Sequence, residues 1–191
     1  MPKPSQVVQN ALIDVGVVAH CWREDRAVVT TEGKSIMKIY RHADCDVLAE
    51  MTTTGFEFSR EIAHEQGIDL GVVVLGERLS NPASVMLLRL PPGHVLERHA
   101  HDTHRMEVVV SGSVITADGH ELRSGDVFTS GPGEFYGPLT AGPEGCTSVE
   151  IFGDIQGMAP RASSDASPEH AAVIASIGKR TLENLDRSNK T

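Results

Sequence analysis

The chain has 191 residues, which suits one globular domain with extensions. Its 17 Lys and Arg residues stand against 26 Asp and Glu residues, so the net charge is -9 with neutral histidines. This acidic balance argues against a nucleic-acid or anionic-membrane partner, because phosphate binding needs clustered Lys and Arg. The longest uninterrupted apolar stretch, residues 70–76, is far too short to span a membrane.

The cysteines indicate a reducing compartment. Cys21, Cys45 and Cys146 are odd in number and widely spaced, and no Cys-x-x-Cys pair is present. The sequence therefore suggests neither a disulfide framework nor a cysteine zinc site. We expect a cytoplasmic protein whose thiols are buried and inert.

The N-terminal part of the chain predicts a short helix followed by strands. Residues 5–15 carry apolar side chains at helical spacing behind Ser5, a residue type that caps helices. Residues 36–40 and 55–62 are candidate strands, the second because aromatic and polar residues alternate along it. We therefore predict that residues 1–70 form a β extension that packs on the main domain.

Residues 71–156 predict that main domain. Gly and Pro turns divide this part of the chain into short apolar segments, and Asp118-Gly119 is a tight-hairpin signal. Short strands at such spacing are typical of an all-β sandwich or barrel. The candidate strands are residues 71–76, 85–90, 107–110, 114–116, 120–122, 125–129 and 147–152.

Residues 157–191 predict a linker and a C-terminal helix. The stretch 158–168 is rich in Ser, Ala and Pro, and Ser167 followed by Pro168 is a helix start. Apolar side chains then recur at helical spacing from Val173 onward. We predict that this helix serves packing or dimerisation rather than chemistry.

Two of the nine histidines, His99 and His101, are spaced as metal ligands on a strand. Residues i and i+2 of a strand project from the same face, about 7 Å apart. Two imidazoles so placed can bind one metal ion at about 2.1 Å each. His94 and His104 lie close by in the chain, and we expect His94 at the rim of the site.

The segment around this pair resembles the first sequence motif of the cupin superfamily, G-x5-H-x-H-x3-E-x6-G, with Gly93 and Gly112 as its outer glycines. Residues 125–136 resemble the second motif, G-x5-P-x-G-x2-H-x3-N, and the two motifs come in the family's order. The resemblance implies a double-stranded β-helix, the jelly-roll cupin barrel, which is usually dimeric. It also implies a divalent metal ion, such as Fe, Mn, Zn or Ni, bound through His, His, Glu and His.

The chain departs from both motifs at positions that bind metal in the family. Arg105 stands in the Glu slot, and an arginine stays protonated and cannot bind a metal. Tyr136 stands in the second motif's His slot, Thr140 in its Asn slot and Gly131 where Pro is usual. Of the family's usual ligands, only the His-x-His pair is present in the sequence.

If the family register holds, Arg105 and Glu107 both face the barrel interior, because alternate residues of a strand share a face. His99, His101 and Glu107 then form a two-His-one-carboxylate metal site with open positions, which is typical of non-haem Fe(II) chemistry. Arg105 can hold a substrate carboxylate or enolate. Tyr136 can be a weak fourth ligand or donate to a developing oxyanion.

A register slip of one residue reverses this picture. The apolar face that begins at Met106 then points inward, Arg105 and Glu107 become a solvated pair, and His104 becomes the candidate third ligand. Glu150, on the last strand, is interpreted as a surface acid. The remaining histidines are interpreted as structural or solvated residues: His20, His42, His64, His120 and His170.

We therefore predict an all-β cupin barrel that binds a metal ion, with a dioxygenase acting on a small polar or enolisable substrate as the leading hypothesis. A metal-dependent but non-oxidative cupin, such as an isomerase, cyclase or lyase, is the first alternative, because a metal can also polarise a carbonyl. A non-catalytic cupin that binds a small molecule is the second. The resemblance also implies a homodimer.

Overall fold

The computed structural model describes residues 40–76 and 79–188. The helix predicted at residues 5–15 and residues 36–39 of a predicted strand lie outside this part, so neither is tested. The helices and strands in chain order are α1 (Val47–Met51), α2 (Glu57–Glu65), β1 (Asp69–Leu75), β2 (Ala83–Leu90), β3 (Val95–Leu96), β4 (His99–His101), β5 (Arg105–Ile115), β6 (Glu121–Arg123), β7 (Val127–Ser130), β8 (Leu139–Phe152), β9 (Pro160–Ala162) and α3 (Pro168–Ser188).

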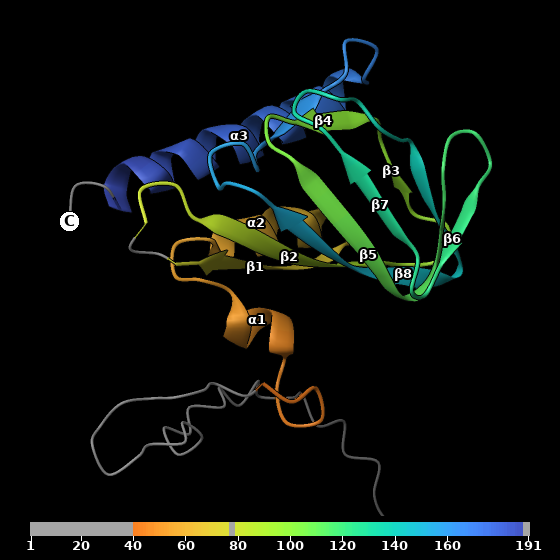
Figure 1. Ribbon diagram of the computed structural model, residues 1–191, viewed down its shortest axis with the longest axis horizontal. Coiled ribbons are helices and arrows are strands. Elements are labelled where there is room, and N and C mark those ends of the chain that lie inside the picture. Colours follow the sequence, from red (N-terminus) through yellow and green to blue (C-terminus); the bar gives the residue numbers. More distant parts are fainter. Residues whose placement is uncertain (1–39, 77–78, 189–191) are drawn as a thin grey trace, which may run out of the picture. The chain divides into compact units, whose positions relative to one another are not determined.

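Seven of these strands form one antiparallel sheet, shown in Figure 1. The order is β1-β2-β8-β5-β6, with β3 beside β8 and β7 beside β5. Strand β4 pairs with β9 in a separate two-stranded sheet. Strands far apart in the sequence, such as β2 and β8, are therefore neighbours, and the predicted all-β jelly-roll barrel is confirmed.

The strand predicted at residues 55–62 is wrong, because this segment begins helix α2. Phe58 and Ile62 are four positions apart, which places them on one helix face, and both are buried in the core. Phe56 directly precedes the helix and stacks on Phe58 with ring centroids 6.1 Å apart. Both aromatic residues are thus buried without any strand, and the described part of the predicted β extension before Asp69 contains α1 and α2 instead.

Two other predicted features are confirmed. The Asp118-Gly119 turn joins β5 to β6, which pair in antiparallel register. Helix α3 begins at Pro168, and the hydroxyl of Ser167 accepts a hydrogen bond from the backbone N–H of His170 at 3.1 Å. Local turn and capping chemistry was sufficient to predict both features, because the groups involved are at most four residues apart.

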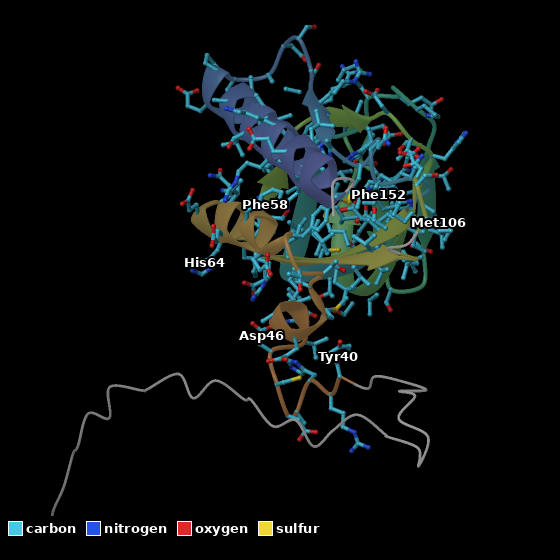
Figure 2. All side chains as sticks on the ribbon, turned by 90° about the vertical axis from the view of Figure 1, so that its left-hand side faces the viewer. Tyr40, Asp46, Phe58, His64, Met106 and Phe152 are labelled. Atoms are coloured by element: carbon cyan, nitrogen blue, oxygen red, sulfur yellow. The ribbon has the colours of Figure 1, made fainter. Side chains whose placement is uncertain are left out.

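The inward face of β5 is the one that the family register predicts. Arg105 and Glu107 are buried, whereas Met106 is 38% exposed and Val110 is 49% exposed. In Figure 2, Phe152 lies among the packed side chains of the sheet, and Met106 lies at the outer side. The alternative of a one-residue slip is therefore wrong.

Helix α3 packs beside β9 and on α2. The guanidinium of Arg180 lies 4.8 Å from the ring centre of Phe58 and 3.8 Å from the carboxylate of Glu61. Because β9 pairs with β4, the helix runs next to the strand that carries the histidine pair (Figure 1). No helix within the described ranges is both long enough and apolar enough to cross a membrane.

Gly112 lies at an irregular point of the barrel. The register between β5 and β8 shifts between Gly112 and Val114, and Gly112 has a φ of +70°, a conformation that side chains disfavour. A Cβ at this position would also overlap the carbonyl oxygen of Gly145. A glycine therefore allows the close approach of two backbones where the sheet curls.

We expect Gly112→Ala to lower the free energy of unfolding by about 3 kcal/mol, because left-handed strain and steric overlap add. Gly119→Ala is the matched control. Its φ is +86° but a Cβ there would meet nothing within 4 Å, so we expect a loss of about 1 kcal/mol. Urea denaturation of both variants measures the difference, and equal losses would contradict the overlap.

Candidate functional site

Strand β4 directs His99 and His101 to the same side, and both are buried, at 6% and 4% exposure. The backbone of β4 is held on both edges. On one edge it pairs with β9, and on the other the N–H of His99 donates to the carbonyl of Tyr136 at 3.1 Å while the N–H of Tyr136 donates back at 3.0 Å. This bridge brings the second-motif tyrosine next to the first-motif histidine pair.

Each imidazole is oriented by a backbone carbonyl. The Nδ1 of His99 lies 2.7 Å from the carbonyl oxygen of Glu97, and the Nδ1 of His101 lies 2.7 Å from that of Met158. A carbonyl can only accept, so each Nδ1 carries the proton and each Nε2 has a free lone pair. Hydrogen bonds of this kind orient the imidazoles of metal sites.

Both lone pairs point at the hydroxyl of Tyr136. This oxygen lies 2.7 Å from the Nε2 of His99 and 3.0 Å from the Nε2 of His101. A phenol has one proton and can donate to one imidazole only. One buried lone pair therefore faces an oxygen without a proton to share, which is a setting that suits a cation.

The three side chains are neutral near pH 7. Burial lowers the pKa of His99, and burial followed by the neighbouring His99 lowers the pKa of His101 to about 4. Burial raises the pKa of Tyr136 above its ordinary value. Neutral imidazoles are the form that can bind a metal ion.

A buried charge cluster lies next to this triad. The Nε of Arg105 donates to the carboxylate of Glu150 at 2.7 Å, and its Nη2 pairs with Glu107. The guanidinium also lies 4.1 Å from the ring centre of Tyr136. Glu107 and Glu150 are directly opposite each other on β5 and β8, so Arg105 separates two carboxylates that would otherwise repel.

The interpretation of Glu150 as a surface acid is wrong, because it is only 4% exposed. Burial opposes its charge, but the charge and hydrogen bond of Arg105, with the nearby histidines, more than offset this and lower its pKa. Burial likewise opposes the charge of Arg105, and Glu150 and Tyr136 raise its pKa. One guanidinium is thus paired with both buried carboxylates.

The structure brings together only the two histidines of the metal site predicted from His99, His101 and Glu107. All three face inward, but Glu107 is paired with Arg105. Across residues 40–76 and 79–188, no set of three or more His, Cys, Asp and Glu side chains is gathered closely enough to hold a metal ion. The donors that do converge are the two imidazoles and the Tyr136 hydroxyl, and His104, the alternative third ligand, is exposed.

A cavity of about 360 Å³ opens beside the histidine pair and extends beneath α2 and α3. His94, which the sequence places at the rim, is half-buried in its lining. The lining also includes His170, for which the sequence predicts a structural or solvated role, and the Nε2 of this residue is buried without a hydrogen-bond partner. The sequence does carry a signal for it, because His170, Val173 and Ile177 share one helix face.

No protein-family model and no curated protein sequence matches the chain. Among solved structures, it is similar to KdgF from Halomonas sp., with 20% identity over 45% of this chain and 80% of that chain and a TM-score of 0.38. A protein of unknown function with a cupin-like fold from Ralstonia eutropha has 15% identity over 62% and 75%, with a TM-score of 0.42. A chain in the structure of Rhodobacter sphaeroides SigE with the anti-sigma ChrR has 17% identity over 45% of each chain, with a TM-score of 0.39.

This chain spans less than half of the length of the chain matched in the SigE–ChrR structure. The strand order and the places of the two motifs in the barrel define the fold independently: β4 carries the histidine pair, and Tyr136 lies against it. The protein has the cupin fold that its motifs predict.

The low pKa of His101 predicts a pH-dependent stability for the metal-free protein. Unfolded histidine, with a pKa near 6.5, takes up a proton on acidification before the folded residue does, so stability falls as the pH drops from about 6.5 toward 4. We expect His101 alone to lower the free energy of unfolding by about 2 kcal/mol between pH 7 and pH 5. His101→Gln should remove that part of the decrease.

His120→Gln is the control, because the side chain of His120 is 77% exposed. It should keep the full wild-type loss of stability. Chemical denaturation at the two pH values measures each variant, and an unchanged loss in His101→Gln would contradict the buried, neutral state of His101.

Proposed function

We propose that the protein is a metal-binding cupin that holds a small molecule in its cavity, with a polar end of that molecule at the metal. The convergence of the Nε2 atoms of His99 and His101 on one phenol carries this proposal. The two Nε2 atoms have two free lone pairs, and the hydroxyl of Tyr136 has a single proton. One buried Nε2 therefore has no hydrogen-bond donor. A divalent cation binds both lone pairs at once.

The charge cluster supports the same proposal. Arg105 is paired with both buried carboxylates next to the histidines, so one positive charge serves two acidic side chains and a bound cation would add a second. The two carboxylates lie on the central strands β5 and β8, far from solvent. Such a buried negative charge costs stability in the metal-free protein and strengthens the binding of a cation.

His99 and His101 would hold the metal, and Tyr136 lies beside both. Glu107 is the carboxylate ligand that the sequence predicts. A bound metal supplies a Lewis acid with open positions for a ligand atom. Tyr136, a neutral phenol, keeps a proton that it can donate to an oxygen of the ligand. Arg105 holds Glu107 and Glu150 in place, and the imidazole pair suits Fe, Zn and Ni among the predicted ions.

We expect His99→Ala or His101→Ala to weaken Zn²⁺ binding by about 100-fold or more, because each removes one of two imidazole ligands. His94→Ala is the matched control, since it removes a half-buried histidine of the same cavity, and it should change the affinity less than threefold by comparison. Titration of the metal-free protein with Zn²⁺ measures these affinities. A wild-type protein that binds no Zn²⁺, Fe²⁺, Mn²⁺ or Ni²⁺ would contradict the proposal.

Glu107→Gln separates a charge effect from a ligand. If Glu107 acts through its charge beside Arg105, the variant loses about tenfold in affinity, as in other changes next to a metal ligand. A loss as large as that of the histidine variants would place the carboxylate in the metal shell, as predicted from the sequence.

The dioxygenase hypothesis has one supporting observation. Both histidines line the cavity, so metal positions on that side are open to O2 and to a substrate. We expect Fe(II)-loaded protein to consume oxygen when acetylacetone or catechol is added, and Zn-loaded protein to consume none. An oxygen electrode measures this, and no uptake with either metal would favour the non-oxidative isomerase, cyclase or lyase, or a binding role.

The homodimer remains a prediction. The outer face of the sheet offers an apolar surface for it, because Met106, Val110 and Val127 are 38%, 49% and 52% exposed. A sheet with one solvated face normally carries polar residues there.

A further inference from the structure

The cavity beside the histidine pair has mainly apolar walls, which Ser59, Gln66 and Thr181 interrupt, and its imidazoles come from β4, the start of α3 and His94. Its volume of about 360 Å³ falls in the range of small-molecule sites, roughly 300–1,000 Å³. The apolar walls come from the sheet and from the inner faces of α2 and α3. They include Ile62, Met86, Leu88, Val173, Ile174 and Ile177.

The cavity is lined by the histidine pair and by a histidine of α3. The Nε2 of His170 is buried and has no hydrogen-bond partner, which is costly unless a ligand supplies one. The imidazoles of His99 and His101 on β4 and of His170 on α3 all line this cavity.

The start of α3 is connected to the histidine strand. The hydroxyl of Ser167, which caps the helix at His170, lies 3.4 Å from the carboxylate of Glu97. The carbonyl of that same Glu97 orients His99. The first turn of α3 and the metal-facing imidazole are therefore positioned by one residue.

We propose that the ligand of this cavity is an amphiphile, with an alkyl or aryl body beneath α3 and one oxygen-bearing end group between His170 and the β4 histidines. This deepens the proposed function and rests on it for the metal contact. A ligand with hydroxyls along its whole length would leave them unpaired against the apolar walls. An apolar body gains from burial there, and its polar end meets His170.

The experiment is calorimetric titration of metal-free and Zn-loaded protein with octanoate and with butyrate. The two probes share the carboxylate and differ in the length of the body. We expect octanoate to bind at least about tenfold more tightly than butyrate, because the longer chain buries more apolar surface. Equal affinities, or no binding of either probe, would overturn the amphiphile proposal.

Variants of α3 locate the probe. Val173→Trp fills the apolar part and should weaken octanoate binding by at least about tenfold. Leu182→Trp, at a position that is 54% exposed on the same helix, should leave it unchanged. Circular dichroism checks that each variant is folded, and a folded Val173→Trp protein with wild-type affinity for octanoate would overturn the proposal.

His170→Ala tests the end group without adding bulk. We expect it to weaken octanoate binding several-fold and to leave Zn²⁺ affinity within threefold of wild type, because His170 contacts the ligand and is not a metal ligand in this proposal. Unchanged octanoate affinity would overturn the role of His170. If the wild-type protein prefers octanoate but binds no Zn²⁺, the proposed metal function fails while the amphiphile site stands.

Discussion

The guanidinium of Arg105 between the carboxylates of Glu107 and Glu150 is the constraint on which the site depends. These three side chains are almost fully buried on the two central strands, where unpaired charges would be costly. Without Arg105, two carboxylates would face each other across β5 and β8. In the cupin motif that this segment resembles, a metal-binding glutamate occupies the position of Arg105. The arginine therefore forms ion pairs at this position, where the motif has a metal ligand.

The groups next to this network are uncharged. The pair of imidazoles and the phenol of Tyr136 remain as the groups that converge on one point, each imidazole held by a carbonyl behind it. A metal in such a site would have neutral ligands, and the carboxylates of Glu107 and Glu150 would lie nearby, paired with Arg105. It would then attract an anionic or strongly polar ligand atom, in agreement with a cavity that opens at the same point.

Helix α3 lines the cavity as well as packing on the rest of the domain. It covers the cavity with Val173 and Ile177, and it adds a buried imidazole whose Nε2 has no partner within the described part of the chain. Its first turn lies against Glu97, so the cover and the histidine pair share a support. The barrel and the start of α3 together supply the imidazoles of the cavity, and the two helices supply much of its apolar wall.

The sequence alone determined the parts that depend on near neighbours. The spacing of His99 and His101, the Asp118-Gly119 hairpin and the Ser167 cap each involve residues at most four positions apart, and the alternation along β5 placed Arg105 and Glu107 on one face. Tertiary structure decided the rest, because it depends on contacts between distant segments. Glu150 faces inward opposite Glu107, 43 positions earlier, and His170 reaches a cavity whose other walls are strands. Phe58 is buried from helix α2 and Phe56 from the position before it, although alternate residues of a strand can also share a buried face. Their alternation therefore could not distinguish a strand from a helix.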